Sequence, residues 1–183
     1  MAGHLYEKDV GIRDVMAGQM TQPMFPVPIY AMEAPLEFED FYAGDSFQLA
    51  RDVKITTCRL NHPDNATGYR VDYQGASLCY ITDTEHIPDK PDENILALIE
   101  GADLVVYDST YTDAEFEHKR GWGHSTWQEG VRLCKAANVK RMAIFHHDPD
   151  HEDGFMEQLE AEAQLAWSGA FAARENMRIY LTA

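Results

Sequence analysis

The sequence predicts an α/β domain in which short strands alternate with helices. Four β-like runs in the first half are separated by turn residues, at 47–50, 53–60, 68–73 and 78–82. In the second half, short apolar runs alternate with helical patterns, which is typical of helices layered on a sheet. A chain of 183 residues can bury one sizeable core, and no linker divides it. We therefore expect a single domain over residues 1–183.

The elements follow in order from their apolar spacing and turn residues. A loose helical period predicts a helix over 5–20, and the prolines of 23–28 then require an extended connector. After the four strands, the pattern predicts helices at 95–100, 125–137 and about 151–175. Buried strands are expected at 104–107 and 142–145, and a final strand at 178–181.

Composition excludes several classes of protein. The net charge of −16 repels a phosphate backbone, so a long nucleic acid is not expected as a partner, whereas a small anionic substrate at a metal ion is. No apolar window reaches the roughly 20 residues of a membrane span, and no secretory signal is visible at the start. Three widely spaced cysteines do not suggest a disulfide framework. We expect a cytoplasmic protein without membrane contact.

Four polar residues stand just after strand-like runs: His62, Asp83, Asp108 and His146. Ligands gather at the carboxyl ends of strands in α/β sheets, because rigid strands hold the loops there. Two imidazoles and two carboxylates suit Zn²⁺, or else Mn²⁺ or Fe²⁺. Each residue alone would also fit a plain turn or cap, so the metal interpretation depends on the four meeting in space.

A second signal is the segment Gly-Trp-Gly-His-Ser-Thr-Trp-Gln-Glu at 121–129. Its Ser/Thr residues and the Gln/Glu three positions later form a capping box, so a helix begins here with free N–H groups that could hold an anion. His124, just outside that end, is a candidate proton donor beside a phosphate, or a surface residue next to a cap. His4, His118 and His151 are expected to be solvated.

At these residues the sequence resembles the phosphodiesterase branch of the metallo-β-lactamase superfamily, which includes ribonuclease Z and phosphoribosyl cyclic phosphodiesterases. The resemblance runs from about residue 20 to residue 153. It is carried in order by Asn61-His62-Pro63, Gly68-Tyr69-Arg70, Tyr80-Ile-Thr-Asp83-Thr-Glu85-His86, Asp103-Leu-Val-Val-Tyr-Asp108-Ser-Thr-Tyr111, Gly123-His124-Ser-Thr126 and Phe145-His146-His147-Asp148-Pro149.

The resemblance implies a role for each candidate. His62 would bind a first metal, Asp83 would bridge two metals, and His146 would bind the second, with His147 as an alternative because the doubled histidine leaves the register open. The metals would be divalent, zinc above all, and two in the complete family site. His124 would be the catalytic acid that protonates the leaving oxygen.

Asp108 would support this site without binding the metal. The hallmark His-x-His-x-Asp-His of the family, however, is absent from this sequence. The resemblance therefore implies an αββα sandwich that is incomplete at its N-terminal side, with this chain as the C-terminal two-thirds.

Two functions fit this pattern. The first is a metal-dependent hydrolase of phosphodiester or cyclic phosphate bonds, in which the missing ligands lie outside this chain. The alternative is a non-catalytic binding or interaction protein that has lost the first ligand motif and that could complete the sandwich as a homodimer. The sequence leaves the substrate open between cyclic nucleotides, cyclic phosphoribose, RNA ends and thioesters.

Overall fold

The computed structural model describes residues 2–4, 10–23 and 25–181, and the chain divides into two compact units, Met1–Asp45 and Ser46–Ala183. A single domain over the whole chain therefore stays a prediction. The first unit holds two parallel strands and two short helices: β1 (Ala2–His4), α1 (Ile12–Gln19), the 3-10 helix Ile29–Ala31 and β2 (Glu39–Phe41).

Helix α1 is shorter than the helix expected over 5–20. Asp40 Oδ1 accepts the N–H of Ile12 at 2.8 Å, which caps the helix where the chain leaves Gly11 in an extended conformation. Residues 5–9 of the predicted helix lie outside the described residues. Residues 25–28, which the structure describes, form no helix, as the prolines of this stretch require.

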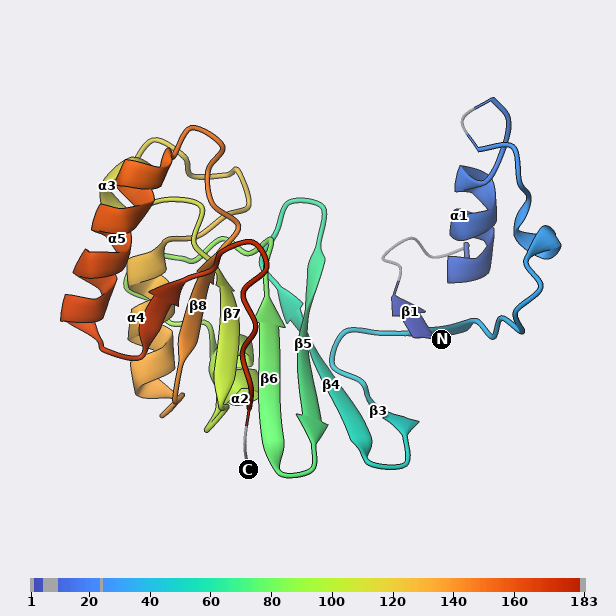
Figure 1. Ribbon diagram of the computed structural model, residues 1–183, viewed down its shortest axis with the longest axis horizontal. Helices are drawn as coiled ribbons and strands as arrows, with labels where there is room; N and C mark the ends of the chain where they lie inside the picture. The colour runs from blue at the N-terminus through green and yellow to red at the C-terminus, as the bar shows by residue number, and fades with distance from the viewer. Residues whose placement is uncertain (1, 5–9, 24, 182–183) are drawn as a thin grey trace. The chain divides into compact units, whose positions relative to one another are not determined.

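The second unit is built on one seven-stranded sheet with neighbouring strands in chain order (Figure 1). Its strands are β3 (Ser46–Ala50), β4 (Val53–Leu60), β5 (Ala66–Tyr73), β6 (Ala76–Ile81), β7 (Leu104–Asp108), β8 (Met142–Phe145) and β9 (Ala170–Ala172). The strands from β3 to β6 are antiparallel hairpins, whereas those from β6 to β9 are parallel. The expected α/β class is confirmed, and the strands at 53–60 and 142–145 have the expected bounds.

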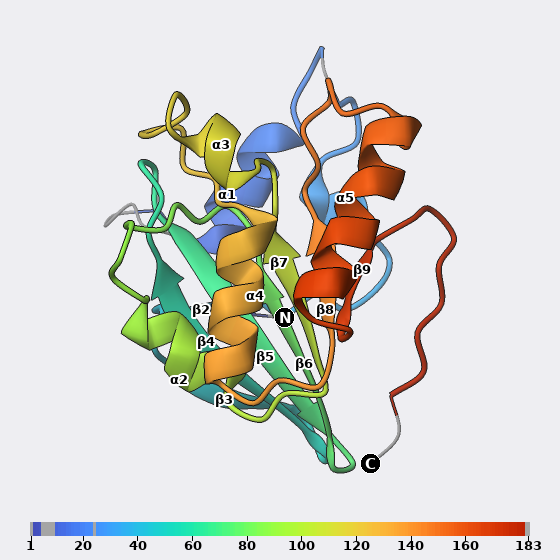
Figure 2. The same ribbon diagram turned by 90° about the vertical axis from the view of Figure 1, so that its left-hand side faces the viewer.

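Helices cover one face of this sheet. Figure 2 shows α2 (Glu93–Ile99), α4 (Trp127–Ala136) and α5 (Asp153–Ala166) in front of the strands, and a short helix α3 (Asp113–Phe116) precedes α4. Side chains alternate between the faces of a strand. Cys79 and Ile81 are therefore fully buried under the helices, while Tyr80 on the other face is 42% exposed.

The parallel register brings the carboxyl ends of three strands to one edge of the sheet. Ile81 of β6 pairs with Tyr107 of β7, and Asp108 of β7 pairs with Phe145 of β8. The loops that follow these strands therefore start side by side, which positions the polar residues that the sequence placed there.

Two expectations for the C-terminal region are wrong. Helix α5 ends at Ala166, not near residue 175, and the last strand is β9, not 178–181. Ala170 and Ala172 are buried against β8, and Glu160 of α5 accepts the N–H of Ala172 at 2.9 Å. Burial and pairing thus outweigh the helical propensity of this alanine-rich segment.

All three cysteines are buried and free, so no disulfide joins them. Burial raises the pKa of the Cys58 and Cys79 thiols to about 12, so both stay protonated at neutral pH. None of the helices in the described part of the chain has the length and apolar character that a membrane crossing requires.

Candidate metal centre

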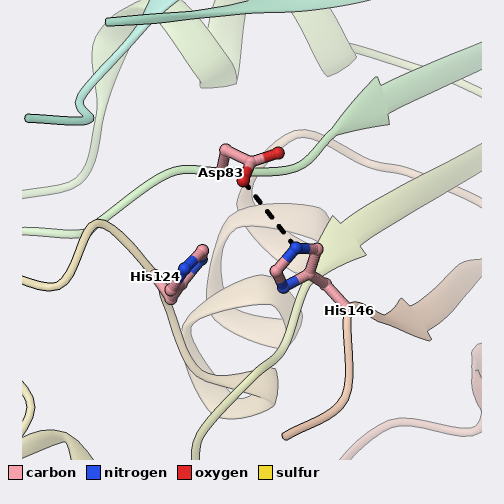
Figure 3. Close-up of side chains that lie close together, drawn as sticks. All are labelled: Asp83, His124 and His146. Atoms are coloured by element: carbon pink, nitrogen blue, oxygen red, sulfur yellow. Dashed lines mark ion pairs between the residues drawn. The ribbon is translucent and has the colours of Figure 1, made fainter. Parts of the chain in front are cut away.

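Asp83, His124 and His146 lie together at the carboxyl edge of the sheet, and each offers a ligand atom within 4.8 Å of the others (Figure 3). Asp83 comes from the loop after β6, His146 directly follows β8, and His124 comes from the loop before α4. Oδ1 of Asp83 lies 3.7 Å from Nε2 of His146. The rings of His124 and His146 stack with their centroids 4.7 Å apart. We call these three residues the strand-end cluster.

The backbone at two of these residues is strained. Asp83 has φ 60° and His146 has φ 61°, the left-handed region that residues with a Cβ rarely adopt. Such conformations cost of order 1–3 kcal/mol and persist where surrounding contacts impose them, often at functional sites. The strain turns both side chains toward each other directly after their strands end.

The hydrogen bond between Thr110 and His146 is compatible with the ring tautomer that a metal ligand requires. The single hydroxyl proton of Thr110 can go to Asp108 Oδ1 at 2.9 Å or to the carbonyl of His146 at 2.8 Å. In either case its oxygen can accept an N–H from Nδ1 of His146, 3.0 Å away. In that tautomer, Nε2 carries a lone pair facing Asp83, as a metal ligand requires.

His124 is held by a carboxylate. Its Nδ1 lies 3.0 Å from Oδ2 of Asp108, whose side chain is fully buried. This hydrogen bond raises the pKa of His124 above its ordinary 6.5, against the opposing effect of partial burial. The ring is therefore biased toward its protonated form, with Nε2 left to donate.

Asp108 connects the loops that carry the cluster. Besides the His124 ring, its Oδ2 accepts the backbone N–H groups of Asp83 at 2.9 Å and Thr84 at 3.2 Å. Its Oδ1 accepts from Thr110 and from the N–H of Ser125 at 3.3 Å. One buried carboxylate thus fixes the loops after β6 and β7 and the loop before α4.

The donor set fits a divalent metal. Asp83 and His146 supply a carboxylate and an imidazole, which are ligand types that zinc shares with manganese and iron. His124 could add a second imidazole only in its neutral form, so positions stay open for water or substrate. Asp83 and His146 stay partly exposed, with 46% and 37% of their side-chain surface accessible, so solvent reaches the cluster.

His62 lies beside the cluster but not within it. Its ring is 6.1 Å from that of His124, between centroids. Its Nδ1 accepts the N–H of Asp64 at 3.2 Å, so in the neutral ring the proton sits on Nε2. His62 would have to break this bond before Nε2 could bind a metal.

The contacts and the exposure of the other histidines agree only in part with the expectation. His147 is not part of the cluster, and its Nε2 lies 2.9 Å from the carbonyl of Ile144. His118 is exposed, as expected. His151 is not solvated: only 7% of its side chain is exposed, and it contacts Glu115 at 2.8 Å and stacks on Phe155. The side chain of His4 lies outside the described residues.

Several N–H groups at the start of α4 already have acceptors within the protein. Thr126 caps the helix and accepts the N–H of Glu129 at 3.1 Å, as expected from the capping box. The N–H of Ser125 goes to Asp108, and that of Trp127 goes to the carbonyl of Tyr111 at 3.3 Å. The expectation of an anion at this helix end therefore has no support from these contacts.

Sequence reasoning missed two supporting residues. Thr110 could have been noticed from its place two residues after Asp108, where a hydroxyl can turn back to a carboxylate. Glu85 lies within a motif that carries the resemblance, but its role gave no signal in the sequence, because its two partners, the N–H groups of Gly121 and Gly123, are far away in the chain.

Comparisons with known proteins point to one family and one fold. The beta-lactamase superfamily domain matches residues 11–147. Ribonuclease Z of Parabacteroides distasonis is 30% identical over 155 residues, covering 85% of this chain and 44% of the relative. Ribonuclease Z of Brevibacillus brevis is 37% identical over 94 residues, covering 49% of this chain and 28% of the relative. The chain thus spans less than half the length of these relatives.

Solved structures have the same fold. The short form of human tRNase Z matches with a TM-score of 0.61 at 19% identity, over 80% of this chain and 52% of that protein. A diphosphatase of the PhnP family matches with a TM-score of 0.59 at 20% identity, over 84% of this chain and 53% of that protein.

Proposed function

The chain belongs to the beta-lactamase superfamily and has the metallo-β-lactamase fold, and from that premise we propose that it forms part of a metal-dependent hydrolase of phosphodiester bonds. The observation that carries the proposal is the strand-end cluster, in which Asp83, His124 and His146 meet on loops fixed by Asp108. The names of the relatives, ribonuclease Z among them, support a phosphodiester as the substrate class.

Asp83 and His146 would hold the metal ion. The Nε2 lone pair of His146 and the carboxylate of Asp83 face the same space, 3.7 Å apart, and His62 stands near enough to His124 to serve a neighbouring position. A bound divalent cation, zinc in our proposal, would activate a water molecule and stabilise charge on the phosphoryl oxygens. The chain provides about half the ligands of a two-metal site, so further ligands would come from outside it.

His124 would act as the general acid. Its Nδ1 is held by Asp108, which keeps the ring oriented and favours the protonated form. Nε2 would then deliver a proton to the leaving oxygen, as a histidine with a raised pKa can do near neutral pH. A protonated ring cannot bind a metal, so the acid role assigns metal binding to Asp83 and His146.

Titration of the chain with Zn²⁺ or Mn²⁺ by calorimetry tests the site. We expect less than one firmly bound metal per chain, because the ligands are few. His146→Ala should weaken binding by about tenfold or more, since loss of even a supporting residue costs about 10–100-fold in metal affinity. His147→Ala is the matched control and should bind like the parent chain.

Three outcomes would contradict this assignment. If His146→Ala and His147→Ala weaken metal binding equally, His146 is not the specific ligand that the cluster requires. Loss of the metal in His124→Ala would make His124 a ligand and remove its acid role. Two tightly bound metals with rapid hydrolysis of bis(p-nitrophenyl) phosphate by this chain alone would show that the ligand count is wrong.

A further inference from the structure

The loop between α3 and α4 displays an aromatic ring and a cation beside the strand-end cluster. Trp122 is 62% exposed although tryptophan is usually among the more buried residue types. The ammonium group of Lys119 lies 4.6 Å from the centroid of the Trp122 ring and 5.4 Å from that of Tyr111. Within the described part of the chain, Lys119 forms no ion pair with a carboxylate. We call Lys119 and Trp122 the aromatic platform.

The platform is held in place by its own backbone. Gly121 and Gly123 flank Trp122 with φ of 87° and 86°, a conformation that glycine adopts without cost. Both glycines donate their N–H groups to Oε2 of Glu85, at 2.7 and 2.9 Å. The turn that presents the exposed indole is therefore fixed by hydrogen bonds, and little backbone entropy remains to be lost when a ligand stacks on the ring.

The platform adjoins the candidate site. A Cβ at Gly123 would lie 2.6 Å from Nε2 of His62, so this turn touches the side chain next to the cluster. The centroid of the Tyr111 ring lies 6.3 Å from that of the His124 ring and 5.4 Å from the ammonium group of Lys119. The buried Tyr111 ring therefore connects Lys119, and with it Trp122, to the cluster.

The chemistry of the platform indicates its ligand. In a chain with 31 acidic and 15 basic residues, an unpaired lysine next to the cluster favours an anion locally. An exposed indole offers a face on which a planar ring can stack, and base–aromatic stacking is a common mode of recognition of unpaired nucleotides. An alkyl phosphate would use the lysine but leave the indole without a contact.

We propose that Trp122 stacks on a nucleobase of the substrate while Lys119 contacts its phosphate, so that the substrate is a small nucleotide phosphodiester. This inference rests on the proposed hydrolase function, because it assumes that the phosphate lies at the cluster.

Ligand-observed NMR tests the platform by measuring how tightly AMP and ribose 5-phosphate bind to the full chain in the presence of saturating Zn²⁺. We expect AMP to bind more tightly than ribose 5-phosphate, which lacks the base. Trp122→Ala should weaken AMP binding by about fivefold to a hundredfold, the range that loss of one stacking contact gives, and leave ribose 5-phosphate unchanged. Trp122→Phe should restore most of the affinity, and Lys119→Gln should weaken both ligands.

Tyr73→Ala is the matched control, because Tyr73 is a 49% exposed aromatic residue at the other end of the sheet. Equal affinities for the two ligands, an AMP affinity that Trp122→Ala leaves unchanged, or no AMP binding at all would each overturn the platform. If AMP binds through Trp122 but ribose 5-phosphate and the metal do not bind, the platform stands and the hydrolase proposal fails. If the metal binds but Trp122→Ala leaves AMP binding unchanged, the hydrolase proposal stands and the platform fails.

Discussion

Single backbone conformations decide the geometry of this site. Asp83 and His146 accept left-handed φ angles, and the N–H of Asp83 is bound by Asp108 while the carbonyl of His146 is bound by Thr110. These hydrogen bonds offset a strain of order 1–3 kcal/mol per residue. The sequence alone offers no sign of this strain, because aspartate and histidine also occur in ordinary turns.

Gly123 allows the loop before α4 to approach His62. We expect Gly123→Ala to destabilise the chain by about 1–2 kcal/mol from the positive φ, plus the cost of moving the His62 ring. Urea unfolding would measure the loss, and the NMR signals of the His62 ring would report its displacement.

Gly121→Ala separates the two effects. Gly121 has nearly the same φ, 87°, but a Cβ there meets no atom within 4 Å. It should show the backbone cost alone and leave the His62 signals in place. An equal loss of stability in both variants, with His62 unmoved, would mean that the close approach has no influence.

Strand β7 is anchored at both ends by an aspartate. Asp108 at its carboxyl end connects the loops of the cluster, and Asp103 just before its start does the same at the opposite edge. Asp103 Oδ2 accepts the N–H of Ser77 at 2.7 Å and its hydroxyl at 3.1 Å, and Oδ1 lies 2.6 Å from the ammonium group of Lys140. These bonds tie the starts of β6 and β7 to the segment before β8.

Asp103→Ala should therefore lower the free energy of unfolding by about 1–3 kcal/mol at neutral pH, since a buried N–H loses its acceptor. The bond to Lys140, followed by those to Ser77, holds the pKa of Asp103 below its ordinary 3.8. A lowered pKa means that the stabilisation is present above pH 3.8 and is lost as the pH falls through the lower folded-state pKa.

The difference in the free energy of unfolding between the parent chain and Asp103→Ala should thus be constant from neutral pH down to about pH 4 and become smaller below that pH. Urea unfolding at several pH values measures it. Ser46→Ala, which removes a hydroxyl that contacts Thr56 on the exposed edge of the sheet, serves as the control with little expected change. A difference that grows as the pH falls would contradict the sign of the pKa shift.

The charge of the whole molecule acts against large anionic partners. A net charge of −16 repels an extended phosphate backbone, whereas one lysine and a bound cation can attract a single nucleotide at short range. The overall charge would therefore limit the size of an anionic substrate and would not select its chemistry.

Fluorescence anisotropy with a single-stranded RNA of about 30 nucleotides tests whether the net charge opposes the binding of long nucleic acids. We expect no binding by this chain up to about 100 μM protein at about 0.15 M salt, which is weaker than typical non-specific binding. Tight binding of this RNA that weakens as salt rises would show that a local basic surface overrides the net charge. The homodimer also stays a prediction, and sedimentation velocity over a range of concentrations would detect it.

Much of the fold could be predicted because it depends on local pattern. The strands at 53–60 and 142–145 follow from apolar runs bounded by turn residues, and Thr126 follows from its capping spacing. The C-terminal segment could not be predicted in this way. Its alanine-rich composition favours a helix, but pairing of β9 with β8 buries the same residues in a strand.

For the candidate site, the sequence by itself determined which residues stand at or just after the ends of strands: His62, Asp83, Asp108 and His146. That follows from strand periodicity, which is a property of neighbours in the chain. Only the tertiary structure decided that His124 joins Asp83 and His146, that His62 lies just outside them, and that His147 contacts the carbonyl of Ile144 instead. Those outcomes depend on left-handed turns, on the contacts of one buried carboxylate and on the approach of Gly123, which join segments distant in the chain.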